Sequence, residues 1–402
     1  ISLFISFYYC IKLFFKKQAI DVVFYYPKHF NREEDNQNLF LKKLLESCKK
    51  HNISYLVFEE PDRKSDKKKH RNSIPFDFPF YLIILLRKFG FRDKSSANIL
   101  LFLFLRNLKF KNVIVLSQSL IEFFRGLDEE AKIFDLQHGI IFSDKESYIS
   151  DGKANSSISY NNVQLLLFGN GFKEILDLSD NTNYYKKSSH VIGVEISKYF
   201  RHFNPNRMVL ITLQITEDHT EKQNKKMLDE IIKIVDSNKD LSFYIRNHPR
   251  FNNCIDISEL ERKTNKAPES LMECFALCSI HITEYSTTTF ECAEFGIPTI
   301  FLNSLKEEFN MFETDFKYPF DIEIVDVIKD YSNYSDEVIS WRKKYYSDYD
   351  EDNKDTWDAE DWENYNYYED EDGPYLITGK EDWCVDADQR IAPASAPRGS
   401  GR

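Results

Sequence analysis

Residues 285–298 read Tyr-Ser-Thr-Thr-Thr-Phe-Glu-Cys-Ala-Glu-Phe-Gly-Ile-Pro and separate two short apolar segments, 278–283 and 299–302. The pattern predicts a strand, a turn rich in hydroxyl groups, a helix that ends at Gly296, and a second strand. A helix that begins directly after a strand brings backbone N–H groups and its positive end to one place, which favours binding of an anion. The stretch therefore predicts a phosphate site formed by the residues Ser286, Thr287 and Thr288.

Glu291 lies one turn into this predicted helix, where it could accept hydrogen bonds from the hydroxyl groups of a sugar. A plainer interpretation exists, because Ser and Thr are the usual N-cap residues and both Glu291 and Glu294 would favour any helix dipole from its first turn. Capping and phosphate binding use the same N–H groups, so the two interpretations are compatible. We expect Glu291 to be the functional acid since it lies nearer the turn.

Strand-like and helix-like segments alternate on both sides of this stretch. Before a turn-rich joint at residues 201–205, the segments typical of buried parallel strands are 19–26, 53–58, 112–116, 131–136, 163–168 and 191–194. After the joint, an amphipathic helix is predicted over 221–237, before a strand at 241–245. Such alternation is typical of parallel sheets with helices on both faces. We therefore predict an α/β chain of two Rossmann-like doubly wound domains, 1–202 and 203–346, that face a central cleft.

A second motif, Gln137-His138-Gly139, follows the predicted strand at 131–136. Ligands of doubly wound sheets bind beyond the carboxyl ends of the strands, which is where this motif falls. Imidazole titrates near neutral pH, so His138 is a candidate general base that deprotonates an acceptor hydroxyl group, with Gln137 and Gly139 beside the acceptor. Gly139 would allow close backbone approach or a positive φ. The alternative is a structural histidine in a strand-to-loop turn.

A third motif, residues 246–250, reads Arg-Asn-His-Pro-Arg after the predicted strand at 241–245. The proline restricts the residue before it, which fixes the direction of the His248 side chain. We expect His248 to face the Ser286 turn across adjacent strand ends, where it could donate a hydrogen bond to a phosphate and stabilise a leaving group. Arg246 and Arg250 could add positive charge there, or be solvated loop residues instead.

The formal charge of the 402-residue chain is −12, and its acidic residues gather near the end. Between residues 348 and 388 only Lys354 and Lys380 oppose them, so we predict a disordered or loosely attached tail over 347–402. The remainder is near neutral and slightly basic, which is typical of an enzyme that handles anionic substrates near a membrane. We expect a cytoplasmic protein, peripheral to the inner membrane face, with no nucleic-acid partner.

Residues 1–15 are mostly apolar, but the run before Lys12 is shorter than the roughly 20 residues that span a bilayer, so they predict a buried element or an interfacial anchor. The seven cysteines are an odd number without paired spacing, which indicates a reducing compartment and free, mostly buried thiols. Cys274 and Cys278, one helical turn apart near His281, could suggest a metal site. No second ligand pair follows, and core positions are the better interpretation.

The three motifs together resemble those of bacterial capsule and surface-polysaccharide glycosyltransferases of GT-B fold, a group that includes Kdo transferases and polysialyltransferases. In this chain the last motif is Thr-Glu-Tyr-Ser-Thr at 283–287, with Glu291 and with Gly-Ile-Pro at 296–298. The chain is more distantly similar to CDP-glycerol glycerophosphotransferases, whose pattern reads Trp-His-Gly, His-Pro and Thr-Asp-Tyr-Ser-Ser. Gln137 in place of Trp favours the capsule group. The resemblance covers residues 21–303 and implies a GT-B-like α/β fold.

The resemblance implies transfer of a sugar from a nucleotide-activated donor, with a CMP-sugar favoured, to a surface or capsular glycan or glycolipid acceptor. His138 would be the base, and Glu291 would lie near the donor ribose. The residues implied at the donor phosphate are His248, Ser286 and Thr287. No Asp-x-Asp motif precedes the tail, so we expect a metal-independent reaction with no cofactor besides the nucleotide-sugar substrate. Two alternatives stay open: an isomerase like the UDP-sugar 2-epimerases, and a non-catalytic scaffold on the same fold.

Overall fold

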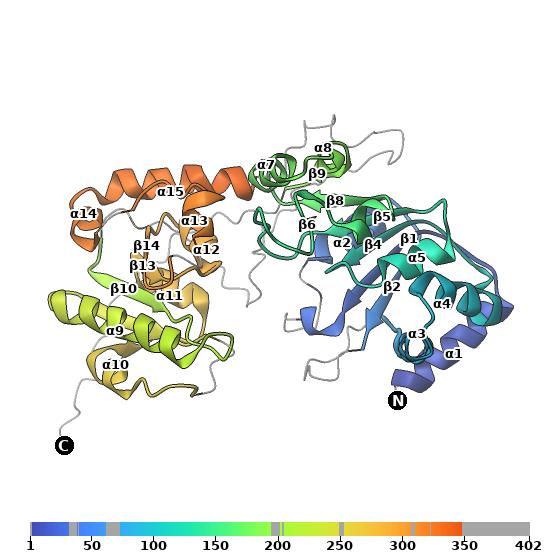
Figure 1. Cartoon of the computed structure of the whole chain (residues 1–402), viewed down its shortest axis with the longest axis horizontal. Coiled ribbons are helices and arrows are strands. Elements are labelled where there is room, and N and C mark those ends of the chain that lie inside the picture. The colour runs from blue at the N-terminus through green and yellow to red at the C-terminus, as the bar shows by residue number, and fades with distance from the viewer. Residues whose placement is uncertain are drawn as a thin grey trace, which may run out of the picture.

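The computed structural model of the protein describes residues 2–31, 38, 40–61, 73–193, 202, 205–248, 253–306, 310–321 and 323–347. Two parallel β-sheets, each covered by helices, organise this part of the chain (Figure 1). The predicted fold class, α/β with two doubly wound parallel sheets, is confirmed. The acidic tail, Pro249 and Arg250 lie outside the described residues.

The first sheet contains seven parallel strands in the order β3-β2-β1-β4-β5-β8-β9. Their bounds are β1 Gln18–Pro27, β2 Tyr55–Glu60, β3 Ile74–Pro75, β4 Leu108–Leu116, β5 Lys132–Leu136, β8 Val163–Leu167 and β9 Ser189–Val191. A small antiparallel hairpin, β6 (Ile149–Ser150) and β7 (Lys153–Ala154), follows β5. The central strands are rich in β-branched and aromatic residues and have apolar side chains on both faces, as expected for strands buried on both sides.

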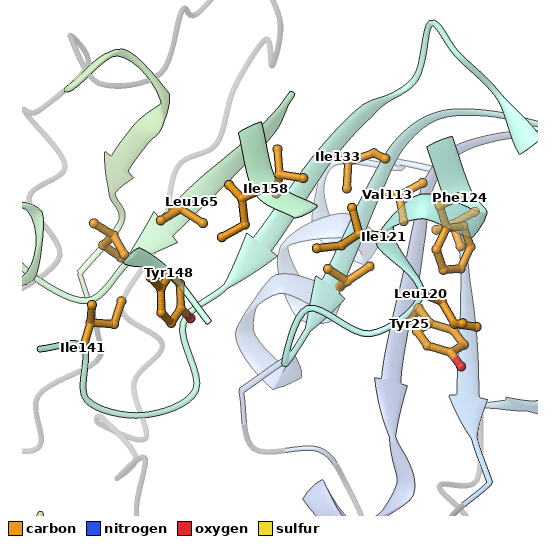
Figure 2. Close-up of a cluster of buried hydrophobic side chains, with 14 of the residues drawn as sticks. Tyr25, Val113, Leu120, Ile121, Phe124, Ile133, Ile141, Tyr148, Ile158 and Leu165 are labelled. Carbon is orange, nitrogen blue, oxygen red and sulfur yellow. The ribbon is translucent and has the colours of Figure 1, made fainter. Parts of the chain in front are cut away.

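Alternate residues of the central strand β1 pack on opposite faces of this sheet. Val22, Phe24 and Tyr26 join the core under helix α2 (Lys42–Lys50). Val23 and Tyr25 join the larger core on the other face (Figure 2). The helices that contribute to that larger core include α1 (Ser2–Phe15), α3 (Asp77–Lys88), α4 (Asp93–Leu100) and α5 (Ile121–Leu127). The period of two along a strand thus sets the two layers.

The second sheet contains five parallel strands in the order β12-β11-β10-β13-β14. Their bounds are β10 Met208–Thr212, β11 Ser242–Arg246, β12 Asn265–Lys266, β13 Ile280–Thr283 and β14 Thr299–Phe301. Helix α9 (Glu221–Ser237) has the bounds that the sequence predicts, and a capping box between Thr220 and Gln223 begins it. The other helices that cover this sheet are α10 (Ser258–Lys263), α11 (Leu271–Leu277) and α12 (Thr288–Glu294).

Helix α15 (Tyr331–Tyr345) joins the two halves of the described chain. It packs on α12 and also on α7 (Asn170–Ser179), which belongs to the first half (Figure 1). The Trp341 ring stacks on Phe290 at 4.7 Å between centroids, and the Tyr345 ring lies 5.4 Å from Phe172. The predicted domain boundary at 202/203 stays a prediction. The remaining helices are α6 (Ser156–Ser159), α8 (Tyr184–Ser188), α13 (Met311–Thr314) and α14 (Ile324–Lys329).

The pattern of residues 98–108 predicts a helix, and the structure is helical there only as far as Leu105. Helix α4 ends at Leu100, a short π-helical segment η2 (Leu101–Leu105) follows, and β4 already begins at Leu108. The run Leu-Phe-Leu-Phe-Leu of η2 is apolar on every side, so its pattern does not distinguish a helix end from the entry to a buried strand. No helix in the described part of the chain combines the length and the apolar character needed to cross a bilayer.

Candidate functional site

The predicted donor-side residues gather at one edge of the second sheet. All its strands are parallel, so Arg246, the last residue of β11, and His248 after it lie at the same edge as Ser286 after β13. The order reverses at β10, which makes the β10–β13 boundary the switch point where ligands of such sheets bind. The prediction that His248 faces Ser286 across adjacent strand ends is wrong, because β10 lies between β11 and β13. Strands β11 and β13 are therefore two strand spacings apart, roughly 10 Å.

The turn at residues 286–288 is closed by its own hydroxyl groups. The Ser286 Oγ accepts a hydrogen bond from the Thr288 N–H (3.2 Å) and donates to the Thr288 Oγ1 (3.0 Å), and the Thr289 N–H donates to the Ser286 carbonyl (3.1 Å). The prediction of free N–H groups is therefore wrong for Thr288 and Thr289. Ser286 is buried and builds the turn, whereas Thr287 is exposed. Thr287 is the hydroxyl residue of this turn best placed to contact a ligand.

The end of α12 follows the prediction. Gly296 has φ +67°, the left-handed conformation that glycine adopts without strain. The Ile297 N–H donates to the Cys292 carbonyl (3.0 Å) and the Gly296 N–H to the Ala293 carbonyl (3.1 Å). This pair of bonds is the Schellman motif, which satisfies carbonyls at the helix end. The turn, helix and next strand are thus fixed by local sequence.

Glu291 is a half-buried carboxyl group among charged neighbours. Burial and, less strongly, the nearby Glu294 raise its pKa to about 7, while Arg342 and Arg246 oppose the shift. Glu294 itself forms a 2.8 Å ion pair with Arg342, and both side chains are more than nine-tenths buried. Glu294 therefore anchors α15, and the functional role expected for Glu291 stays a prediction.

Arg246 is held by the loop that follows β12. Its Nη1 donates to the carbonyl oxygens of Pro268 (2.8 Å) and Glu269 (2.7 Å). The alternative of a solvated loop residue is therefore wrong for Arg246. A cavity of about 400 Å³ lies beside it at the carboxyl ends of β11 and β12, lined by residues 245–247 and 264–269 and by Glu261. The half-buried His248 follows directly in the chain.

Sequence reasoning missed His219 at this edge. It lies in the loop after β10, and its Nε2 is hydrogen-bonded to the Tyr285 hydroxyl across the β10–β13 switch point. The His219 Nδ1 lies 3.4 Å from the Thr216 Oγ1. The signal was present in the sequence, since His219 follows the apolar run 208–213 and stands just before the helix predicted from 221. It is the same strand-to-helix position that singled out Ser286.

Gln137 is a positioning residue in the first sheet. Its side chain is buried, its Nε2 donates to the Gly139 carbonyl (2.8 Å), and its Oε1 accepts from the Phe168 N–H (2.8 Å). These bonds fix the turn that presents the half-buried His138, whose ring lies edge-on to Phe30 at 5.4 Å. The expectation that Gly139 has a positive φ is wrong. The space beside its Cα is open, which is compatible with the other expectation, that a ligand approaches the backbone closely here.

A row of aromatic rings connects His138 with α12. Consecutive centroids along it are 5.3–6.4 Å apart, and the rings in order are His138, Phe30, Phe40, Phe168, Tyr346 and Phe290. Ser143 adds a polar contact between the halves, since its N–H donates to Asp315 (2.7 Å). That His138 shares one site with the residues of the second sheet stays a prediction.

Asp135 is a buried carboxyl group two residues before Gln137. It accepts hydrogen bonds from the Gln118 N–H (3.0 Å) and the Tyr148 hydroxyl (3.3 Å). Burial raises its pKa to about 7, although these bonds and the nearby Lys145 oppose the shift. Burial also lowers the pKa of Lys145, whose Nζ donates to the Ile140 carbonyl (2.6 Å).

Asp135→Asn is expected to stabilise the protein above neutral pH. The folded state keeps the Asp135 proton where the unfolded state has lost it, so the stability of the parent falls as pH rises from about 4 to about 7, by up to about 4 kcal/mol. Asparagine stays neutral and removes this loss. The melting-temperature gain of the variant should therefore grow between about pH 5 and about pH 8. The exposed Asp240→Asn is the control, and an equal gain at both pH values for Asp135→Asn would contradict the assignment.

Cys274, Cys278 and His281 are core residues, as the sequence favours. Both cysteines are buried in the core between α11 and α12. The His281 ring bridges Thr212 (2.8 Å) and Thr299 (2.9 Å), and burial lowers its pKa to about 3. In the described ranges no three His, Cys, Asp or Glu side chains are grouped so that they could hold a metal ion.

The chain is similar to several solved structures, although no protein-family model and no curated protein sequence matches it. One is the wall teichoic acid polymerase TagF, H444N variant, with 12% identity over 85% of this chain and 87% of that one, at a TM-score of 0.44. A putative UDP-N-acetylglucosamine 2-epimerase from Listeria monocytogenes has 13% identity over 82% and 93%, at 0.49. The UDP-GlcNAc 2-epimerase from Methanocaldococcus jannaschii, in complex with UDP-GlcNAc and UDP, has 11% identity over 82% and 93%, at 0.45. At these TM-scores and identities, nothing about activity passes from those proteins to this chain.

Proposed function

We propose that this chain is a glycosyltransferase that moves a sugar from a nucleotide-activated donor, with a CMP-sugar favoured, to a surface or capsular glycan acceptor. One observation carries the proposal: Arg246, His248 and Thr287 lie at a single carboxyl edge of a doubly wound sheet, and Arg246 lines a cavity of about 400 Å³ at that edge. That edge is where such sheets bind nucleotides. Cationic groups and hydroxyls there suit a phosphate, and the cavity has room for a base.

The reaction joins the acceptor hydroxyl oxygen to the anomeric carbon of the donor sugar, while the bond from that carbon to the phosphate oxygen breaks. The phosphate leaves with the bonding electron pair, and His138 takes the acceptor proton. His248 and the Thr287 hydroxyl stabilise the charge that develops on the phosphate. Glu291, which is half-buried with a raised pKa, accepts or donates a hydrogen bond at the donor ribose.

Nucleotide binding tests the donor side directly. Among CMP, CDP, UDP and GDP, we expect CMP to raise the melting temperature most, since a CMP-sugar is the favoured donor. A ligand that binds only the folded state stabilises it by about 2.7 kcal/mol at about 100 times its Kd. Arg246→Ala should weaken this binding about tenfold or more, since it removes a charged group at the phosphate. Arg207→Ala is the matched control: Arg207 is exposed, at the amino edge of the same sheet, paired with Asp240. No shift with any nucleotide would overturn the proposal.

The isomerase alternative predicts a different product. A transferase needs an acceptor, whereas a 2-epimerase converts its nucleotide sugar alone. Incubating the chain with a UDP-sugar and following the sugar protons by NMR distinguishes the two. If the sugar is epimerised without an acceptor, the chain is an isomerase that uses the same nucleotide site, and the proposed transfer is wrong.

A further inference from the structure

The exposed apolar side chains of this protein are concentrated on three adjacent segments. Of the fifteen large apolar residues that are exposed in the described ranges, twelve belong to α1, to the end of α3 with the loop after it, or to η2. They are Leu3, Phe4, Ile5, Phe7, Tyr8, Ile11, Phe15, Leu85, Phe89, Phe91, Phe102 and Leu103. Single exposed apolar residues are ordinary, but a gathering of this size indicates a binding surface.

The three segments pack against one another and form one surface, which we call the α1 face. The Ser2 hydroxyl donates to Asp77 (2.7 Å), and the Phe78 N–H donates to the Ser6 Oγ (3.0 Å). The Phe78 ring contacts Phe7 at 4.9 Å and Phe104 at 5.2 Å between centroids. Helix α1 also packs directly on η2. Figure 1 shows α1 and α3 at the side of the first sheet away from the labelled helices of the second.

Helix α1 has two apolar sides. Ser6, Cys10 and Leu13 are buried against the first sheet's core. Phe4 and Phe15, at 78% and 79% exposure, lie with Tyr8 and Ile11 at spacings of four, three and four residues. That spacing puts all four on one outward stripe of the helix. The core does not need this stripe, so the stripe is available to a partner.

The charges around the α1 face identify the partner. Residues 1–17 and 77–111 contain ten basic residues and two acidic ones, in a chain with net charge −12. Both acids are satisfied within the fold: Asp93 pairs with Arg87 at 2.5 Å, and Asp77 is buried. The exposed basic residues are Lys12, Lys16, Lys17, Arg87, Lys88, Arg92, Lys94, Arg106, Lys109 and Lys111. Lys94 and Lys111 pair with Glu129 and Asp21 of neighbouring elements. Aromatic side chains among exposed lysines are typical of surfaces that enter the headgroup region of an anionic bilayer.

A second copy of the chain fits this surface less well. Protein interfaces are enriched in aromatic residues and arginine but depleted in lysine, and two such faces would bring like charges together. An anionic bilayer removes that repulsion and takes up exposed Phe side chains at the level of its headgroups. We propose that the α1 face docks the protein on an anionic membrane surface, with Phe4, Phe15 and Phe102 inserted among the lipids. This inference does not depend on the nucleotide site.

Vesicle sedimentation tests the proposal with the full chain. We expect strong binding to vesicles of phosphatidylglycerol and phosphatidylcholine, weak binding to pure phosphatidylcholine, and a loss in high salt. Combining Phe4→Ser, Phe15→Ser and Phe102→Ser should weaken binding to the mixed vesicles about tenfold or more. The matched control combines Tyr160→Ser and Leu178→Ser, at residues that are 89% and 85% exposed elsewhere, and should bind like the parent.

Two outcomes would overturn the proposal. One is equal binding of the triple variant and the parent, with both folded by circular dichroism. The other is that the parent does not bind the vesicles but is dimeric, whereas the triple variant is monomeric. That result would assign the α1 face to a second copy of the chain. An additional variant with Lys16→Gln, Lys17→Gln and Lys88→Gln keeps the apolar stripe. It should lose the preference for phosphatidylglycerol while remaining folded, because all three lysines are exposed.

Discussion

His138→Gln should lower the rate of sugar transfer about 10²–10⁴-fold and leave nucleotide affinity within about twofold. Glutamine has a similar size and can hydrogen-bond, but it cannot take a proton at neutral pH. The turn itself should survive, because the buried Gln137 side chain fixes it through Gly139 and Phe168. Turnover with a CMP-sugar and an acceptor, beside nucleotide titration by calorimetry, separates the two effects.

The matched control is His190→Gln, which changes a histidine of the edge strand β9 that is bonded to Gln164 at 2.8 Å. Its transfer rate should stay within about twofold of the parent's, since the change lies outside the proposed base. A large fall in nucleotide affinity for His138→Gln, with turnover at saturation unchanged, would contradict the base assignment and make His138 a donor-binding residue.

Arg342→Met should destabilise the fold by about 3–5 kcal/mol, because it leaves the Glu294 carboxylate buried without its partner. The pair is 2.8 Å long and both side chains are almost completely buried between α12 and α15. Urea unfolding gives the free energy of unfolding directly. Since α15 also packs on α7, the loss should extend to the contact between the two halves.

The double variant Arg342→Met with Glu294→Leu is the informative comparison. Replacing both members of a buried pair by apolar residues of similar size is often neutral, so most of the lost stability should return. The exposed pair of Lys225 and Glu221 supplies the control: Lys225→Met should leave the free energy of unfolding nearly unchanged. If the double variant were as unstable as Arg342→Met, shape rather than charge would decide the packing of α15.

Local sequence predicts most of the architecture, and the reason is visible in particular elements. Helix α9 has the predicted bounds because a capping box begins it and a regular apolar stripe continues through it. The end of α12 is likewise determined locally, because Gly296 adopts the positive φ that stops the helix. The helix predicted over 98–108 ends early, at Leu105, because the apolar run 101–105 has no period that would mark where the helix stops.

The candidate site is predictable to the level of a sheet edge. Parallel strands all end on one side, so the motifs at Arg246, His248 and Ser286 had to share an edge once the alternation of strands and helices was recognised. Strand order was not predictable from the same pattern, and the position of β10 between β11 and β13 corrected the expected adjacency. The partners of Glu294 and Tyr285 stand 48 and 66 residues away in the sequence, beyond any local signal.

Sequence by itself therefore determined the kind of elements, their order along the chain and which residue types end each strand. Hydrophobic period, caps and turn residues act over a few neighbours, and they carry that information without tertiary contacts. Tertiary structure alone decided that Glu294 holds α15 and that exposed aromatic residues from three segments share the α1 face. Those outcomes depend on which distant surfaces pack together, and packing is a property of the whole fold.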